Sequence, residues 1–238
     1  MPDLEIPAEQ PPPPPTAKPS LLIPALGLLL LSAVGLLIWR NALGSSGRPA
    51  TDAAYQVYDP DASPLRGFAL EPPRPAPDFT LIDPEGQPFR LAQSQGEARL
   101  LFFGYTECPD VCPQTLTRLA AGLRALGPRA ERARVIFISV DPERDTPERI
   151  GRYVAGFHPR ITGLTGELAT LEAVAADYGV AFEKDPPAGA AAGVGDYQML
   201  HSATVFLIDP AGRIRATYLE PLPEDLAQDL GWLLDEDG

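Results

Sequence analysis

The stretch that decides the fold is residues 98–116, "ARLLFFGYTECPDVCPQTL". It opens with an apolar run typical of a buried strand, and we predict that Pro113 is the first residue of the helix that follows. Leucines then recur at helical spacing, at Leu116, Leu119, Leu123 and Leu126. Both cysteines of the chain, Cys108 and Cys112, lie between strand and helix, where open α/β sheets usually place their sites.

The pattern on both sides of this stretch alternates strands with helices. Thr146 is a predicted helix N-cap, with Pro147 in the first helical turn. The other expected elements are a hairpin at 79–91, a strand at 133–140, a helix from Leu168 to Tyr178, a strand–turn–strand at 203–219 and a last helix at 224–234. This order predicts an α/β, thioredoxin-like domain with a central mixed sheet flanked by helices.

Composition limits the class of protein. The chain has 238 residues, 45% of them hydrophobic, which suits one folded domain with a real core plus additional segments. A formal net charge of −13 argues against nucleic acid and anionic lipid as partners. Two cysteines are too few for a disulfide scaffold in a chain of this length, so the pair indicates chemistry.

The N-terminal quarter of the chain differs in composition from the rest. Residues 1–20 form a Pro-rich tail that we expect to be disordered, and residues 21–40 form one expected transmembrane helix. Its 19 continuously apolar or small residues would extend roughly 28 Å, close to the thickness of a bilayer core. A cleaved signal peptide is the alternative. We expect a linker at 41–76 and the folded domain at 77–238; the flanking charges do not settle the orientation.

The cysteine pair alone is compatible with a disulfide, a metal clamp or a redox pair. A thiol near a helix N-terminus is stabilised as the thiolate. Pro109 prevents both cysteines from occupying one regular helix face, so a turn must bring them together. They could also be two buried small hydrophobes, but their Pro, Asp and Glu neighbours are not core neighbours. Of the two histidines, His158 is interpreted as a surface or capping residue.

Five segments in order resemble motifs of the SCO/SenC family, a family of membrane-anchored, copper-binding, thioredoxin-fold proteins of cytochrome c oxidase assembly. They are "GYTECPDVCP", "ISVDPERDTPERI", "YVAGF", "GLTG" and "DYQMLHSATVFLID". The resemblance runs from about residue 77 to the C-terminus. It implies that Cys108 and Cys112 are thiolate ligands of copper and that His201 is the imidazole ligand. It also implies an orienting or electrostatic role for Asp141, whereas Glu107 departs from the family pattern.

The chemistry of these residue types agrees with the resemblance. Two thiolates and an imidazole suit Cu(I), and could hold Cu(II) with one more ligand, whereas structural zinc prefers four protein ligands. The cysteine spacing is one residue longer than Cys-x-x-Cys, which favours metal binding over disulfide exchange. His201 could alternatively be a hydrogen-bonded residue at a strand start. Met199 is interpreted as core packing rather than a soft ligand, and the run 143–148 as a solvated turn and helix cap.

The resemblance implies a single-pass protein of the cell membrane, anchored by its N-terminal helix, with the domain outside the cytoplasm. It would receive copper, from other copper chaperones among the candidate donors, and build the copper centre in the copper-bearing subunit of cytochrome c oxidase. An alternative is a thiol–disulfide oxidoreductase that uses Cys108 and Cys112 to reduce the oxidase's cysteines; a peroxidase is a weaker one. We also expect the loop 185–195 to be mobile without metal and ordered with it.

Overall fold

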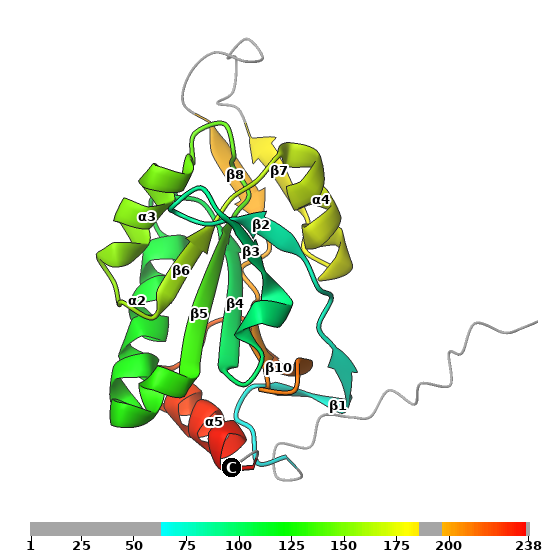
Figure 1. The fold of residues 1–238 in the computed structure, drawn as a ribbon, viewed down its shortest axis with the longest axis vertical. Coiled ribbons are helices and arrows are strands. Elements are labelled where there is room, and N and C mark those ends of the chain that lie inside the picture. The colour runs from blue at the N-terminus through cyan, green and yellow to red at the C-terminus, as the bar shows by residue number, and fades with distance from the viewer. Residues whose placement is uncertain (1–62, 186–196, 237–238) are drawn as a thin grey trace, which may run out of the picture. The chain divides into compact units, whose positions relative to one another are not determined.

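The computed structural model describes residues 63–185 and 197–236, and its centre is a six-stranded mixed sheet (Figure 1). The strand order is β1-β10-β9-β4-β5-β6, in which β4, β5 and β6 are parallel and the other pairings are antiparallel. The strands are β1 (Phe68–Pro75), β4 (Ala98–Gly104), β5 (Ala133–Ser139), β6 (Ile161–Leu164), β9 (Val205–Ile208) and β10 (Arg213–Tyr218). Two hairpins accompany this sheet: β2 (Thr80–Ile82) with β3 (Pro88–Arg90), and β7 (Phe182–Asp185) with β8 (Gln198–His201).

In the described part of the chain, four α-helices pack around the sheet. They are α2 (Val111–Ala125), α3 (Pro147–Ala155), α4 (Leu168–Asp177) and α5 (Pro223–Glu236), with short 3-10 helices at Leu91–Ser94 and Gly127–Arg132. Helices α2 and α5 pack against each other, and α3 packs against the edge strand β6. This is the thioredoxin-like layer of mixed sheet and helices that the alternation of strands and helices predicts.

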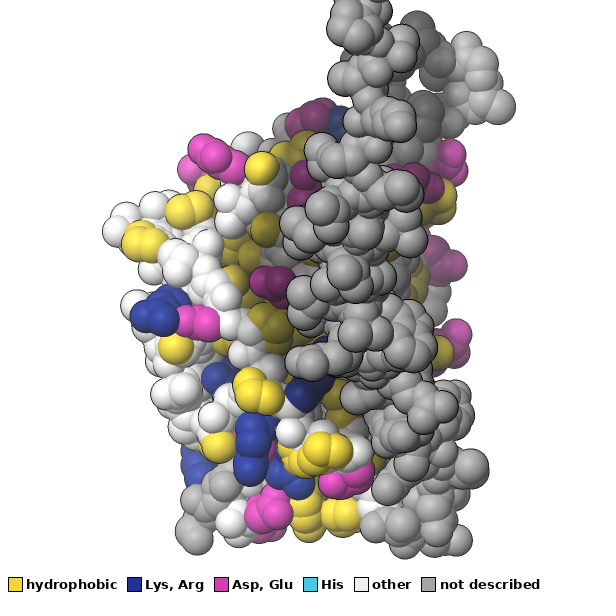
Figure 2. Space-filling model, turned by 90° about the vertical axis from the view of Figure 1, so that its right-hand side faces the viewer, with side chains coloured by type: hydrophobic (Ala, Val, Ile, Leu, Met, Phe, Trp, Pro, Cys, Tyr) yellow, Lys and Arg dark blue, Asp and Glu magenta, His cyan; other side chains and the backbone are white. Residues whose placement is uncertain are grey.

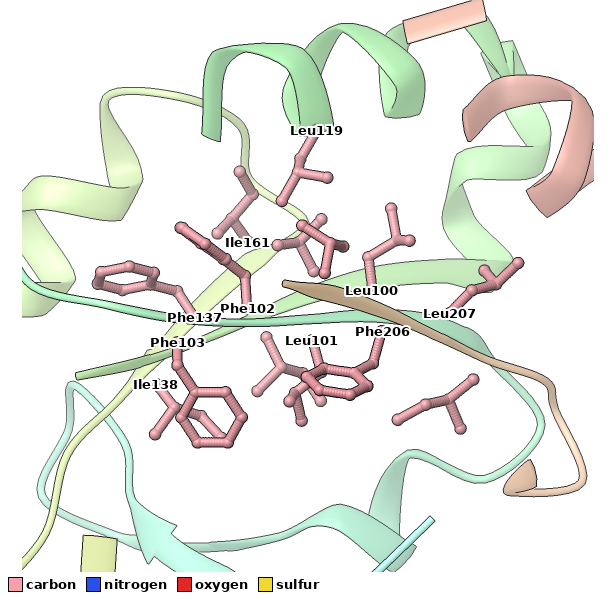
Figure 3. Close-up of a cluster of buried hydrophobic side chains, with 14 of the residues drawn as sticks. Leu100, Leu101, Phe102, Phe103, Leu119, Phe137, Ile138, Ile161, Phe206 and Leu207 are labelled. Carbon is pink, nitrogen blue, oxygen red and sulfur yellow. The ribbon is translucent and has the colours of Figure 1, made fainter. Parts of the chain in front are cut away.

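The central strand β4 is buried along its whole length. Successive side chains of a strand point to opposite faces, so β4 supplies the core on both sides of the sheet. Leu100 and Phe102 point toward α2 and its Leu119 (Figure 3). Leu101 and Phe103 point to the opposite face, and all four of these β4 side chains are 0% exposed. Packing on both faces fixes where β4 ends, and therefore where the segment that carries the two cysteines, residues 105–112 (the cysteine segment), begins.

Several expected elements are confirmed. The hairpin β2–β3, the strand β5 and the strand–turn–strand β9–β10 lie where the sequence predicts them. The hydroxyl of Thr146 accepts a hydrogen bond from the backbone N–H of Arg149, so Thr146 is the N-cap of α3, with Pro147 at its first position. Helices α4 and α5 also agree with the predicted ranges to within a few residues.

Two element boundaries differ from the expectation. Strand β1 lies within the predicted linker 41–76 and pairs with β10, so the folded domain begins before residue 77. The prolines of this segment indicate a linker from sequence alone. An edge strand nevertheless tolerates proline, because one row of its backbone N–H groups needs no partner. Helix α2 begins at Val111 rather than at Pro113. Pro113 still lies in the first turn, where backbone N–H groups lack helical partners, and Cys112 therefore becomes part of the helix.

The predicted tail, the predicted transmembrane helix and most of the predicted linker lie outside the described residues, as does nearly all of the loop 185–195. Within the described ranges, no helix is both long enough and apolar enough to cross a membrane. On the face drawn in Figure 2, acidic side chains occur over most of the height, and basic side chains lie among acidic and hydrophobic ones.

Candidate metal centre

Three potential metal ligands converge although two of them are far from the third in sequence. The Sγ atoms of Cys108 and Cys112 and a ring nitrogen of His201 all lie within 4.8 Å of one another. The Sγ of Cys112 lies 3.4 Å from Nε2 of His201. Both cysteines are free thiols in the structure, Cys112 fully buried and Cys108 8% exposed. The site therefore has one enclosed sulfur, one sulfur near the surface and one half-buried imidazole.

A turn followed by the first turn of α2 brings the two sulfurs together. The N–H of Cys108 donates to the carbonyl of Tyr105, and the N–H of Cys112 donates to the Sγ of Cys108, at 3.4 Å. Gly104, the last residue of β4, leaves space for Cys112, because a Cβ there would lie 2.8 Å from its sulfur. As Pro109 requires, the cysteines do not share a regular helix face: one precedes α2 and the other lies within it.

Strand β8 positions the imidazole of His201 at its C-terminal end. The Nδ1 atom lies 3.2 Å from the carbonyl oxygen of Ser202, which only accepts, so Nδ1 is placed to donate to it. Nε2 faces Cys112 and is the nitrogen available to a metal ion. The rings of Tyr105 and Phe102 contact the imidazole edge to face, with centroids 5.9 and 6.2 Å away, which fixes its orientation.

The two thiols share one proton. The hydrogen bond from the Cys112 thiol lowers the pKa of Cys108 to about 3, helped by His201 and by backbone N–H groups of Cys112 and Asp110 against the opposing effect of burial. The same hydrogen bond, together with burial, raises the pKa of Cys112 far above its ordinary range. The pair therefore titrates as a unit that keeps a single negative charge around neutral pH.

These ligands fit a soft metal ion. With metal–ligand bonds of about 2.0–2.3 Å, three ligand atoms around one ion are separated by about 3.3–4.0 Å. The observed separations, 3.4 Å for one pair and within 4.8 Å for all, require only a small contraction. Two sulfurs and one imidazole are the donor set that Cu(I) prefers. Among the described residues, no further His, Cys, Asp or Glu joins this cluster.

Asp141, expected to orient the site or act on it electrostatically, is 1% exposed and lies just after β5. Its carboxylate accepts hydrogen bonds from the Tyr197 hydroxyl at 2.6 Å and from Arg144 Nε at 2.5 Å. Arg144 in turn donates to Glu107, the residue before Cys108. Asp141 thus connects to the cysteine segment through Arg144, and its orienting role remains a prediction.

Sequence reasoning missed Asp145. It lies in the run 143–148, interpreted as a solvated turn, but it is 1% exposed. Its carboxylate accepts hydrogen bonds from Ser139 and from both the N–H and the hydroxyl of Thr106, two residues before Cys108. Burial raises the pKa of Asp145, although these hydrogen bonds oppose the shift. The local sequence carries no signal for this role, because the hydrogen-bond donors come from other segments.

The remaining candidates occupy less direct positions. Met199 is 6% exposed and belongs to the hydrophobic core, in agreement with the packing interpretation. His158 is half-buried, and its Nδ1 accepts the N–H of Arg160 in a turn after α3. The carboxylate of Glu107 is paired with Arg144 and Arg149, so the residue that departs from the family pattern adds little net charge beside Cys108.

The site opens to solvent on the side of the β7–β8 hairpin. A hollow of about 410 Å³ lies against His201, lined by Ala181, Phe182, Glu183, Leu200, His201 and Ser202. Neither cysteine lines this hollow, so the imidazole is the one of the three ligands that borders it.

A thioredoxin-like domain that carries two cysteines at the end of a central strand and a histidine on a late hairpin defines the class: a thioredoxin-fold protein with a site for a soft metal. The sequence profile of the SCO1/SenC family matches residues 69–235, so the chain belongs to the SCO1/SenC family. The match includes all but the first residue of strand β1, both cysteines and His201.

Individual relatives agree with this assignment. The mouse mitochondrial SCO2 homolog is 39% identical over 137 residues, which cover 57% of this chain and 52% of the relative, so the match spans about half the relative's length. The copper-bound structure of Bradyrhizobium japonicum ScoI is 40% identical, with a TM-score of 0.61, and the match covers 67% of this chain and 99% of that one. The solution structure of apo Sco1 from Thermus thermophilus is 41% identical, with a TM-score of 0.64, over 71% of this chain and 97% of that one.

Proposed function

We propose that this protein binds one copper ion through Cys108, Cys112 and His201 and transfers it during assembly of the copper centre of cytochrome c oxidase. The observation that carries the proposal is the convergence of these three ligand atoms within 4.8 Å of one another. The likeness to ScoI, whose structure is copper-bound, supports copper as the ion. The protein's role is that of a carrier, so copper is its cargo rather than a permanent cofactor.

The arrangement suits a carrier because its ligands differ in exposure. Cys112, fully buried in the first turn of α2, holds the ion from the protein side. Cys108 and His201 lie nearer the surface, and the hollow beside His201 gives a partner's ligands access. Ligand exchange can then begin at His201 while both sulfurs still hold the ion. The copper-bearing subunit of the oxidase is the proposed recipient.

The proposal includes the cellular setting. The apolar run at residues 21–39 anchors the chain in the cell membrane as a single span, with the domain on the extracytoplasmic side. The observations behind this part are the length of that run and the resemblance to a membrane-anchored family. Protease protection of the C-terminal domain in spheroplasts and inverted vesicles tests the orientation: the domain should be digested in spheroplasts and protected in inverted vesicles.

Copper titration tests the carrier function. Residues Val57–Gly238 form one compact unit with its own core, so this fragment is suitable for the measurement. Reduced, anaerobic protein should bind one equivalent of Cu(I), and Cys108→Ser and His201→Ala should each weaken binding at least about tenfold. His158→Ala, a histidine outside the site, is the matched control and should bind as the wild type does. Binding that is independent of His201 would contradict the three-ligand site.

A second candidate function rests on the thiols alone. Cys108 has a strongly lowered pKa and its sulfur lies within 4.8 Å of the Cys112 sulfur, which suits a dithiol that reduces the oxidase's cysteines. In that reaction the Cys108 thiolate attacks a partner disulfide, which releases one partner thiol and leaves a mixed disulfide. Cys112 then gives up its proton and attacks the Cys108 sulfur, which releases the second partner thiol and forms the Cys108–Cys112 disulfide. Dithiol exchange should survive in His201→Ala, whereas copper retention should not, so this variant separates the two functions.

A further inference from the structure

We propose that Arg144 is a positioning residue that keeps strand β8, and with it His201, at a fixed position relative to the cysteine segment. The inference rests on the proposed function, because it concerns how the two halves of the copper site are kept together. The cysteines belong to the β4–α2 connection, whereas His201 belongs to the separate two-stranded sheet of β7 and β8. Side-chain contacts, rather than backbone pairing within the main sheet, must therefore fix the distance between them.

Arg144 contacts both halves of the site with one guanidinium group. Its Nη1 donates to the carboxylate of Glu107, next to Cys108, and to the backbone carbonyl of Tyr197, just before β8, each at 3.0 Å. The guanidinium also lies over the Tyr197 ring, 3.7 Å from its centroid. Its carbon is 5.8 Å from the centroid of Tyr105, the ring that packs against His201.

Tyr197 is fixed by its backbone, its ring and its hydroxyl. The carbonyl accepts from Arg144, the ring stacks under the same guanidinium, and the hydroxyl donates to Asp141 at 2.6 Å. Tyr197 directly precedes β8, which ends at His201. Because β8 has only four residues, fixing Tyr197 just before its start also constrains the position of His201 at its end.

Asp141 fixes the guanidinium that makes these contacts. Its carboxylate accepts a hydrogen bond from Arg144 Nε, while Arg144 Nη1 donates to the Glu107 carboxylate and to the Tyr197 carbonyl. The side chains of Arg144 and Asp141 are 18% and 1% exposed, so solvent weakens the bond between them little, whereas the bond to Glu107, which is 39% exposed, is more strongly screened. A lysine ammonium could not reproduce the planar fork, because it is a compact charge at the end of a flexible stem. The geometry thus requires arginine at residue 144.

The chain offers a matched control in Arg149. It also pairs with Glu107 and donates to Thr106, but its contacts stay on the cysteine side and none of those described reaches Tyr197 or β8. Arg144→Met and Arg149→Met therefore remove the same charge beside the same carboxylate. Only the first removes the guanidinium contacts to Tyr197, while the hydrogen bond from the Tyr105 hydroxyl to Gln198 of β8 remains in both.

The first measurement needs no copper. In the metal-free full chain, hydrogen exchange of the β8 amides should be about tenfold faster in Arg144→Met than in the wild type, because a charged hydrogen bond that holds Tyr197 is lost. Exchange in β4 and β5 should stay unchanged, which establishes that the variant is folded. Arg149→Met should leave β8 unchanged, and Arg144→Lys should fall between the wild type and Arg144→Met. Unchanged β8 exchange in Arg144→Met would overturn the proposal.

The second measurement asks whether the effect passes through His201. Arg144→Met should lower Cu(I) affinity about 10- to 100-fold, the range found when a residue that supports a metal ligand is lost. In the His201→Ala background the same substitution should have no further effect, since there is no imidazole left to position. Equal losses in both backgrounds would contradict a positioning role. Failure of the wild type to bind copper would instead refute the proposed function, while the exchange result would still decide the role of Arg144.

Discussion

The Nε2 atom of His201 lies 3.4 Å from the Sγ of Cys112, although the two residues are 89 positions apart in the chain. Cys112 is fixed rigidly, because it is fully buried in a helix that packs on the central sheet. His201 is fixed less rigidly, at the end of a four-residue strand in a hairpin outside that sheet. Substitutions next to Cys112 should therefore affect the site through core packing, and substitutions next to β8 should affect it through the orientation of the His201 imidazole.

Cys108 should react as a thiolate over a wide pH range. The hydrogen bond from Cys112 lowers the pKa of Cys108 to about 3, so the thiolate fraction barely changes between pH 5 and pH 8. An ordinary thiol with a pKa of about 8.5 would react several hundred-fold more slowly at the acidic end. The measurement is the iodoacetamide reaction rate of the metal-free, reduced protein, with mass spectrometry to identify the modified residue.

Cys112→Ala is the variant that tests the cause. Without the donor thiol, the pKa of Cys108 should return toward the ordinary range, and its alkylation rate should rise steeply with pH. If the wild-type rate rises about tenfold per pH unit below pH 8, the shared-proton description of the pair is wrong.

Gly104→Ala should weaken both folding and copper binding. A Cβ at residue 104 would lie 2.8 Å from the Cys112 sulfur and 2.7 Å from the Phe137 ring, both closer than ordinary contact and both in the core. Such overpacking typically costs about 1–3 kcal/mol of unfolding free energy, and here part of the strain moves a ligand. Urea unfolding and copper titration measure the two effects.

Gly156→Ala is the matched control for that substitution. The added Cβ would meet only the Tyr153 carbonyl oxygen, at 3.4 Å, at the end of α3. Its φ of −69° is available to alanine, so the free energy of unfolding should change by less than about 1 kcal/mol. Equal losses in the two variants would show that Gly104 has no special relation to Cys112.

The sequence predicts some parts of this structure well because the forces involved are local. Strand β4 is a continuous apolar run, helix α2 has apolar residues at helical spacing, and Thr146 with Pro147 is a helix-start signal. Strand β1 is hidden by its prolines, which only an edge position makes acceptable. The hairpin β7–β8 has two four-residue strands that are not close in sequence, which is too little pattern to distinguish them from irregular structure.

Some residues of the candidate site can be predicted from the sequence and others cannot. Cys108, Cys112 and His201 can be named from residue type and family resemblance, because ligands must have particular donor atoms. Arg144 and Asp145 cannot be found in this way. Their positions depend on donors and acceptors from distant segments, such as Thr106, and a charged residue in a turn ordinarily indicates solvent exposure.

Asp145→Asn should change how stability depends on pH. Burial raises the pKa of Asp145, so the folded state binds this proton more tightly than the unfolded state does. The contribution of the aspartic acid is therefore fully present below its unfolded pKa and is lost as the pH rises through the higher folded value. Relative to the asparagine variant, which does not titrate, the wild type should lose stability between pH 3.5 and pH 7.

Urea unfolding of both proteins at several pH values measures this difference. Asp235→Asn is the control, because the Asp235 side chain is 70% exposed and its ion pair with Arg129 is a surface pair that contributes little to stability. A wild type that gains stability over the asparagine variant as the pH rises would mean that the hydrogen bonds from Thr106 and Ser139 outweigh burial, and that Asp145 is ionised at lower pH than an ordinary aspartate.

Copper binding should release about one proton per ion at pH 7–8. The cysteine pair holds one proton in this range, because the pKa of Cys108 is lowered and that of Cys112 is raised by their shared hydrogen bond. Coordination by both sulfurs must displace that proton, so the Cu(I) affinity should rise about tenfold per pH unit. Calorimetric titration in buffers of different ionisation enthalpy counts the protons. Two protons per ion would mean that both thiols are protonated before binding, and none would mean that Cys112 stays protonated and only Cys108 and His201 hold the ion.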